Sequence, residues 1–207
     1  MTVSSPTRTP GGPPSRPHPP ALYAVIGLLR LEGNSGHGYD LARHLAPGEP
    51  LAEVIRLEPG MLYHYLKALE RLGWVTVGYQ AQATRPSRHV YDLTDPGRTA
   101  WDAWLREPVG QTREIRFTFL LKWYFAGRTD PAAAAPLLAA QRATCARLVE
   151  SLTTQLGAAR DAPVDDARDA PVGVPGERLG SRSDFRRVVL DLRLSQTRAV
   201  VEWLGRL

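Results

Sequence analysis

The chain has 207 residues and a mass of 22.8 kDa, enough for one domain or for two small ones. Apolar residues make up 43% of it and charged residues 23%, which excludes a chain that is disordered throughout. Its longest apolar run, residues 21–29, is too short to cross a bilayer, and no small-residue cleavage site follows it. We therefore expect a cytoplasmic protein with no membrane partner. The single cysteine, Cys145, excludes an intramolecular disulfide.

The net charge of +5 is unevenly placed along the chain. Residues 21–112 carry nine basic and ten acidic side chains, whereas residues 113–207 carry fifteen and eleven. Only Lys67 and Lys122 among the 26 basic residues are lysines, which is typical of a GC-rich genome. Scattered arginines are therefore weak evidence of a nucleic-acid surface, and any DNA binding has to depend on where the charges lie.

Two segments lack the pattern of a folded core. Residues 1–20 contain seven prolines, two arginines and no acidic residue, which predicts a disordered tail. Residues 161–180 are rich in Asp, Pro, Gly and Arg and form a low-complexity insert between two helical patterns. Apart from these segments we expect two folded regions, residues 21–107 and residues 113–207.

The first region begins with the pattern of three helices. Apolar side chains within 22–29 recur at i, i+3, i+4 and i+7, which places them on one helical face. Residues 33–36, Gly-Asn-Ser-Gly, predict a turn, and a short helix over 39–45 follows. A third helix begins at Pro59 and ends before Gly73. Its apolar face consists of Leu62, Tyr65, Leu66 and Leu69.

The hydrophobic period then changes from helical to alternating. Residues 75–80 and 89–93 alternate in polarity, which predicts a two-stranded hairpin with Arg85 and Arg88 at or near its tip. Thr94 is placed to cap a fourth helix. Three helices, a basic-tipped hairpin and a further helix describe a winged helix-turn-helix, whose third helix enters a DNA major groove. We therefore expect a mainly α fold with a small β-hairpin, in which this domain comes first.

The second region predicts helices throughout. Residues 113–125 are rich in aromatic residues, and one face of a helix there would hold Phe117, Leu120, Leu121 and Tyr124. A long helix runs from Pro131 to about residue 160, with sevenfold spacing of Leu138, Cys145 and Leu152. A last helix repeats that spacing with Phe185, Leu192 and Ala199, and has Val189 and Trp203 in the companion position.

Sevenfold spacing is typical of helices that pack along their length, within a hairpin or across a dimer. The sevenfold positions form an apolar stripe along each of the two helices. We expect the stripe on the long helix to cover part of the stripe on the last helix, and a partner subunit to cover the rest. The residues predicted to form the dimer interface are Leu138, Leu152, Phe185, Leu192 and Trp203.

Several motifs resemble one known family. Residues 38–41 read Gly-Tyr-Asp-Leu, residues 59–63 Pro-Gly-Met-Leu-Tyr, and residues 66–73 Leu-Lys-Ala-Leu-Glu-Arg-Leu-Gly. Together with residues 88–97, their order resembles the PadR family of bacterial transcriptional regulators over about residues 21–107. The longer C-terminal region resembles that family's longer subfamily, whose members dimerise through C-terminal helices. The resemblance implies a winged helix-turn-helix, double-stranded DNA as partner and a homodimer.

The side chains expected to contact DNA lie on the third helix and the hairpin. The polar face of a helix in a groove meets phosphates and base edges, and the wing meets flanking phosphates. The alternative is an ordinary solvated face and a solubilising loop. The candidates are Tyr63, His64, Lys67, Arg71, Arg85 and Arg88.

Aromatic side chains gather in the fourth and fifth predicted helices. They form either an ordinary core or a pocket for a small aromatic or apolar effector near the dimer interface. The residues concerned are Trp101, Trp104, Phe117, Phe119 and Trp123.

The sequence gives little evidence of an enzyme active site or of a metal site. The histidines at 37, 44, 64 and 89 have no metal-ligand spacing, so we expect no metal and no cofactor. The glycine-rich residues 33–38 lack the Gly-Lys-Ser/Thr ending of a phosphate loop, and no nucleophile elbow is present. Cys145 is expected to be a buried, inert thiol and not a redox sensor.

The sequence therefore predicts a non-enzymatic, sequence-specific DNA-binding regulator: a ligand-responsive repressor that binds a palindromic operator as a homodimer. A ligand or protein that changes the angle of the dimer would release it. The alternative is a winged-helix module for protein–protein contacts without specific DNA binding, which the net charge of −1 over residues 21–112 favours.

Overall fold

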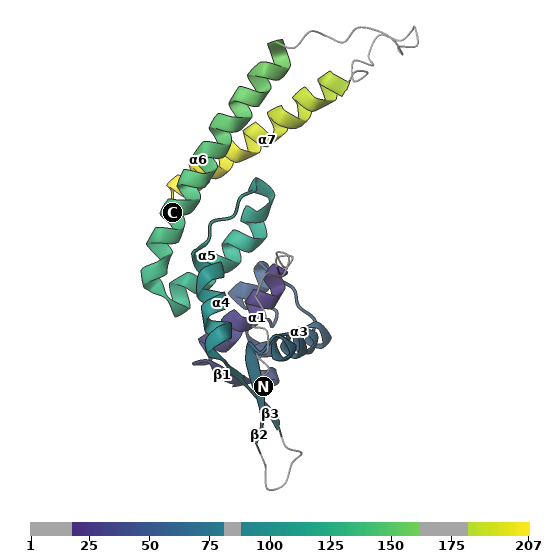
Figure 1. The fold of residues 1–207 in the computed structure, drawn as a ribbon, viewed down its shortest axis with the longest axis vertical. Helices are drawn as coiled ribbons and strands as arrows, with labels where there is room; N and C mark the ends of the chain where they lie inside the picture. The colour runs from purple at the N-terminus through teal and green to yellow at the C-terminus, as the bar shows by residue number, and fades with distance from the viewer. Residues whose placement is uncertain (1–17, 81–87, 162–181) are drawn as a thin grey trace, which may run out of the picture.

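The computed structural model describes residues 18–80, 88–161 and 182–207 (Figure 1). The predicted tail, the residue Arg85 and the low-complexity insert lie wholly or almost wholly outside these ranges. The elements follow in chain order as α1 (Pro20–Leu31), β1 (Ser35–His37), α2 (Gly38–Arg43), η1 (Pro50–Glu53), α3 (Pro59–Arg71), β2 (Val75–Gln80), β3 (Arg88–Leu93), α4 (Asp95–Arg106), η2 (Thr112–Glu114), η3 (Ile115–Phe119), α5 (Leu120–Thr129), α6 (Pro131–Asp161) and α7 (Arg182–Gly205). Among these residues, no helix has both the length and the apolar character needed to cross a membrane.

Helices α1, α2 and α3 form the winged-helix core as the periodicity predicts. The apolar side chains of α3, Leu62, Leu66 and Leu69, are completely buried, whereas Tyr65 is only half-buried. The helix ends at Gly73, whose φ of +70° suits a residue without a side chain. One face of α3 is therefore anchored in the core and the other is left in solvent.

The sheet has three antiparallel strands in the order β1-β3-β2, one strand more than the predicted hairpin. Strands β2 and β3 pair from Val75 opposite Leu93 to Gln80 opposite Arg88. The predicted turn is present, with Gly33 and Asn34 at positive φ, but the residues that follow it form β1 on the other edge of β3. Three residues are too few to show alternation in a sequence, so the prediction of a turn alone was incomplete.

Helix α4 begins against the turn that follows α3. The Thr94 hydroxyl accepts a hydrogen bond from the Gly97 amide at 3.2 Å and donates one to the Gly73 carbonyl at 2.7 Å. A side chain at Gly97 would clash with the backbone oxygen of Trp74. The predicted cap is confirmed, and the cap also fixes α4 to the base of the wing.

The predicted helix over 113–125 is wrong in its geometry. A short 3-10 turn, η2, and a π-helix, η3, precede α5. A π-helical turn contains more residues than an α-helical one and therefore rotates the face that follows. Phe117, Leu120 and Tyr124 are only half-buried as a result, whereas the buried positions are Ile115, Thr118, Phe119, Leu121, Lys122, Phe125 and Ala126.

Helices α6 and α7 form an antiparallel hairpin that projects away from the wing (Figure 1). Arginines connect its two ends: Arg142 of α6 donates to the Leu204 carbonyl at 2.7 and 3.0 Å, and Arg187 of α7 donates to the Ala159 carbonyl at 2.7 Å. Each guanidinium thus satisfies a carbonyl near the end of the opposite helix. This reciprocal pairing fixes the register of the hairpin.

The heptad residues of α6 are buried as predicted, whereas those of α7 do not pack against them. Leu138, Cys145 and Leu152 of α6 are buried. Helix α7 turns Leu190 and Leu194 toward α6 and leaves Phe185, Leu192 and Ala199 exposed, so the expectation that the α6 stripe covers part of the α7 stripe was wrong. The apolar residues of the exposed stripe include Phe185, Val188 and Leu192.

Candidate nucleic-acid interface

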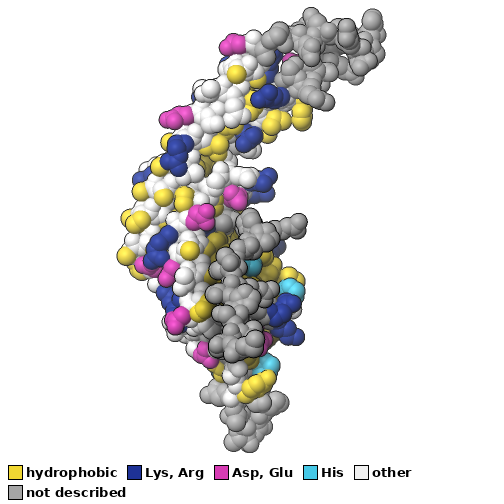
Figure 2. Space-filling model, in the orientation of Figure 1, with side chains coloured by type: hydrophobic (Ala, Val, Ile, Leu, Met, Phe, Trp, Pro, Cys, Tyr) yellow, Lys and Arg dark blue, Asp and Glu magenta, His cyan; other side chains and the backbone are white. Residues whose placement is uncertain are grey.

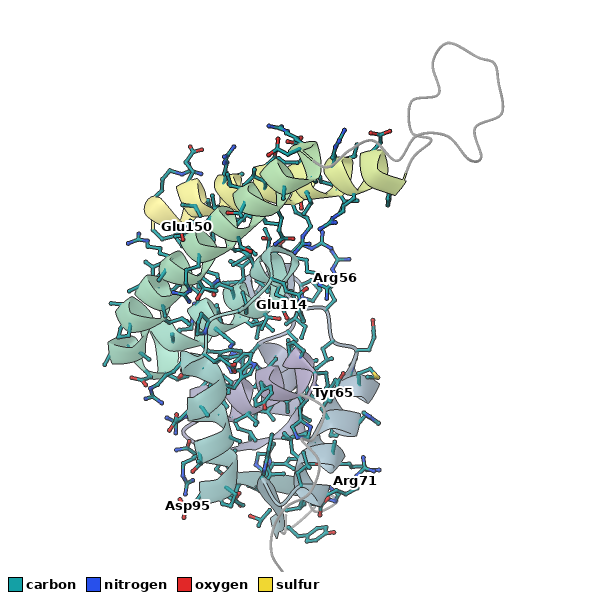
Figure 3. The ribbon with its side chains drawn as sticks, turned by 45° about the horizontal axis from the view of Figure 1, so that its top comes forward. Arg56, Tyr65, Arg71, Asp95, Glu114 and Glu150 are labelled. Carbon is teal, nitrogen blue, oxygen red and sulfur yellow. The ribbon has the colours of Figure 1, made fainter. Side chains whose placement is uncertain are left out.

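The exposed face of α3 holds the predicted contact residues of this helix together. Tyr63, His64, Lys67 and Arg71 are all exposed, since they lie opposite the leucines that enter the core. Figure 3 shows the Arg71 side chain projecting from α3, on the side of the molecule away from Asp95. Its Nε donates to the Lys67 carbonyl at 3.3 Å, which leaves the guanidinium tip in solvent. Histidine and basic side chains gather on this side of the surface (Figure 2).

The wing lies beside α3 and carries exposed aromatic side chains. Tyr79 of β2 is 73% exposed, and its ring meets that of His89 on β3 edge to face at 4.9 Å. Neither residue was predicted to contact DNA. The alternation of side chains along the strands places both on the face of the sheet that is buried nearer the core. They are exposed because the strands extend past the core. Arg88 begins β3, and Arg85 lies outside the described residues.

A hollow of about 480 Å³ lies between α2, the start of α3 and strand β3. Its lining residues are His37, Gly38, Tyr39, Asp40, Tyr63, His89 and Tyr91. The Nδ1 atom of His37 lies 3.0 Å from the His89 carbonyl oxygen, which joins β1 to the wing. Burial raises the pKa of the Tyr91 phenol, and Tyr63, Glu70 and Tyr79 raise it further, so this hydroxyl stays protonated at neutral pH.

The predicted aromatic cluster packs α1, α4 and α5 together. Trp101 and Phe119 are completely buried, while Trp104, Phe117 and Trp123 are half-buried. The ring of Trp104 stacks on Tyr23 at 4.8 Å, and Trp101 meets Phe125 at 5.3 Å. Most of the cluster is therefore core. The Nε1 hydrogen of Trp101 nevertheless has no acceptor among the described residues.

The lysine beside this cluster was not among the predicted site residues. Lys122 is 3% exposed, its ammonium lies 4.8 Å from the centre of the Trp104 ring, and it donates to the Glu107 carbonyl at 2.5 Å. Burial lowers the pKa of Lys122 to about 8, although Glu107 and Glu114 act in the opposite direction. The available signal was a lone lysine in the apolar run 119–125.

Side chains from the C-terminal helices hold the segment between α4 and η2. The amide of Gln141, which is completely buried, accepts from the Val109 N–H at 2.8 Å and donates to the Val109 carbonyl at 3.0 Å. The hydroxyls of Thr112 and Thr197 are 2.7 Å apart. Within the described residues, no group of three or more His, Cys, Asp or Glu side chains is placed to hold a metal ion.

A short helix, a second helix with an exposed polar face, and a wing beside it define a winged helix-turn-helix protein. Residues 25–103 match the model of the "Transcriptional regulator PadR-like family", and residues 115–207 match "Virulence activator alpha C-term". Residues 25–103 therefore carry a PadR-like domain, as the sequence motifs predicted, and the second match fits the longer subfamily. Both models are of regulators and neither is of an enzyme.

Known relatives cover different shares of the chain. It is 32% identical over 105 residues to "Negative transcriptional regulator PadR" of Bacillus subtilis (strain 168), which covers 50% of this chain and 54% of the relative. The chain thus spans about half the length of the curated relatives it matches. Among solved structures, Bacillus subtilis PadR with operator DNA is 23% identical, has a TM-score of 0.43 and covers 92% of this chain and 97% of that one. The same protein with p-coumaric acid is 21% identical, with a TM-score of 0.34 and coverage of 92% and 96%.

Proposed function

We propose that the protein is a sequence-specific DNA-binding transcriptional regulator, a ligand-responsive repressor that binds a palindromic operator as a homodimer. One observation carries the proposal: Tyr63, His64, Lys67 and Arg71 form a continuous exposed face on α3, beside the wing. A helix anchored by its apolar face can place such side chains against base edges and phosphates in a major groove. In a dimer, two such helices would enter successive major grooves.

A mobility shift with the DNA upstream of the protein's own gene tests this function. Lys67→Ala and Arg71→Ala should each weaken binding by about 1–3 kcal/mol where a base edge is read, and less where a phosphate is contacted. Arg147→Ala is the matched control, because it removes one exposed positive charge from α6 and should change nothing. About six phosphate contacts per dimer would give a log–log salt slope near −5. Normal binding by both α3 variants would contradict the assigned face.

The second candidate function is a winged-helix module for protein contacts. The net charge of −1 over residues 21–112 favours it, since a DNA-binding domain usually gains affinity from positive charge. The same mobility shift separates the two functions. Absence of any shift at low salt, where phosphate contacts are strongest, would favour the protein-contact module.

The proposed dimer uses the exposed stripe of α7. Phe185, Val188 and Leu192 are 61%, 52% and 56% exposed and lie on one side of the helix. Contiguous exposed apolar side chains of this kind mark contact surfaces. Trp203 is half-buried against Phe119, whereas Leu138 and Leu152 are buried within the chain and would support the interface only indirectly.

Light scattering tests the dimer directly. Leu192→Glu places a charge in the stripe and should convert the dimer to a monomer with a folded α6–α7 hairpin. Arg198→Ala is the control, because it also lowers the net charge by one but lies on another exposed side of α7. A dimeric Leu192→Glu variant would show that the interface lies elsewhere.

The proposed effector is a small aromatic or apolar compound bound at Trp101, Trp104, Phe117, Phe119 and Trp123. The unpaired Nε1 hydrogen of Trp101 supports a site here, because a buried donor without an acceptor is unfavourable. Titration with p-coumaric acid, the compound named for the Bacillus subtilis structure, should quench tryptophan fluorescence and weaken the mobility shift. Trp104→Leu should reduce the quenching. Unchanged fluorescence and unchanged DNA binding would argue against this compound class.

A further inference from the structure

We propose that the hollow between α2, α3 and β3 binds a backbone phosphate of the DNA, and that its histidines couple DNA binding to proton uptake. The inference rests on the proposed DNA-binding function and adds a second contact site to the polar face of α3. Its residues include Tyr39, His37 and His89, which the predicted contact set does not contain.

The position of the hollow suits a phosphate. Tyr63 enters it from α3, and His89 and Tyr91 enter it from the wing strand β3. When α3 lies in a major groove and the wing meets the flanking backbone, one DNA strand has to pass between them. A phosphodiester of that strand would therefore lie over the hollow.

The hollow supplies donors that carry no charge. Tyr39 is 71% exposed and Tyr63 is 43% exposed, and tyrosine hydroxyls are common partners of DNA phosphates. Gly38 allows Tyr63 to lie close, since a Cβ at residue 38 would be 2.6 Å from the Tyr63 ring. The Tyr63 ring is thus held against the start of α2 before DNA arrives, which reduces the entropy lost on binding.

His37 is arranged to take up a proton on its outer nitrogen. A carbonyl oxygen only accepts hydrogen bonds, so the Nδ1 atom that faces the His89 carbonyl at 3.0 Å carries a hydrogen. The Nε2 atom is therefore the site of proton uptake, and once protonated it becomes a charged donor for a phosphate. The bond through Nδ1 persists in both states and holds the ring in place.

One acidic side chain lines the hollow together with the histidines. Asp40 from α2 lines the same hollow and repels a phosphate. Glu32, which adjoins His37 in a neighbouring hollow, is paired with His44 at 2.6 Å. The other titratable groups that face His37 or His89 are the phenols of Tyr39, Tyr63, Tyr79 and Tyr91. The negative charge of Glu70 contributes to the raised pKa of Tyr91. Arg88 precedes His89 in β3.

The net charge of residues 21–112 indicates how DNA affinity should change with pH. Residues 21–112 carry a net charge of −1 with neutral histidines. Protonation of His37, His89 and the exposed His64 of α3 would bring this to +2. DNA affinity should therefore rise as the pH falls, because histidine gains its charge between about pH 8 and pH 5.

Fluorescence anisotropy with the upstream DNA, at constant ionic strength from pH 8 to pH 6, tests the proposal. We expect the affinity of the wild-type protein to increase at least about ten-fold, and His37→Gln to remove much of this increase. His18→Gln is the matched control, because His18 packs against Tyr23 and Trp74 and should leave the pH profile unchanged. Asp40→Asn should raise affinity at pH 8, and Tyr39→Phe and Tyr63→Phe should each lower it several-fold.

The outcomes separate this inference from the proposed function. If Lys67→Ala and Arg71→Ala weaken binding but the Tyr39, Tyr63, His37 and Asp40 variants bind as the wild type does at every pH, the hollow is not a phosphate site. If the phenol variants weaken binding and the pH profile stays flat, proton coupling is refuted. If the wild-type protein binds no DNA at any pH, the proposed function fails together with this inference. Circular dichroism shows whether each variant is folded.

Discussion

The stability of the protein should depend on pH through the buried Lys122. Its ammonium is almost completely shielded from water, between the Glu107 carbonyl and the Trp104 ring. Burial lowers the pKa of this group to about 8, whereas a lysine in water has a pKa of about 10.4. The folded protein therefore releases the proton at a lower pH than the unfolded chain.

The sign of the effect follows from the number of bound protons. Between about pH 8 and pH 10 the unfolded chain still holds a proton that the folded chain has lost, so the free energy of unfolding rises with pH. Below that range both states are protonated, and the buried charge lowers stability by a constant amount. One pKa unit corresponds to about 1.4 kcal/mol, so the rise from pH 7.5 to pH 9.5 should be about 2 kcal/mol.

Urea denaturation at pH 7.5, 8.5 and 9.5 measures this rise, with Lys122→Met as the variant that cannot titrate. Lys67→Met is the control, because it removes the only other lysine, which is exposed, and should follow the wild type. Burial also raises the pKa of Tyr23 and Tyr91, which lowers stability with rising pH, but only above about pH 10. Parallel curves for the wild type and Lys122→Met would show that Lys122 is not the source of the pH dependence.

Three further substitutions test the packing, and a fourth serves as a control. Leu66→Ala, at a completely buried position of α3, should lower the free energy of unfolding in urea by about 2–5 kcal/mol. Gly97→Ala should lower the thermal midpoint because its methyl group meets the Trp74 carbonyl, whereas Gly127→Ala, in open space on α5, should raise it slightly. Gln141→Leu leaves the Val109 N–H and C=O unpaired and should cost about 2–6 kcal/mol. Faster hydrogen exchange of the Val109 amide would locate this loss, and unchanged exchange would contradict it.

The parts of the fold that the sequence predicted depend on residues close together in the chain. The buried face of α3 follows from the spacing of Leu62, Leu66 and Leu69, and the start of α4 follows from the Thr94 cap. The exposed residues of α3 follow for the same reason, since they occupy the remaining side of the same helix. Periodicity thus predicted the helical part of the candidate interface.

The parts that were missed depend on partners distant in the chain. Strand β1 exists because Ser35 to His37 pair with β3, more than fifty residues later, and the hollow exists because these same elements meet α3. The rotated face after residue 115 results from a π-helix that no local pattern marks. Lys122 is buried in an apolar run because its acceptor, the Glu107 carbonyl, comes from the segment after α4. A sequence read one segment at a time does not contain these pairings.

The same distant pairings connect the C-terminal helices to the winged helix. Three helices bind the segment after α4. Lys122 of α5 binds the Glu107 carbonyl, and Gln141 of α6 binds the peptide groups of Val109. Thr197 of α7 binds the Thr112 hydroxyl. Helix α4 is in turn fixed to α3 through the Thr94 cap. The C-terminal helices are thus connected to the winged helix by directional hydrogen bonds as well as by the chain itself. In the dimer proposed above, a change in the angle of α6 and α7 would change the distance between two α3 helices, and DNA with fixed groove spacing would then favour one arrangement over the other.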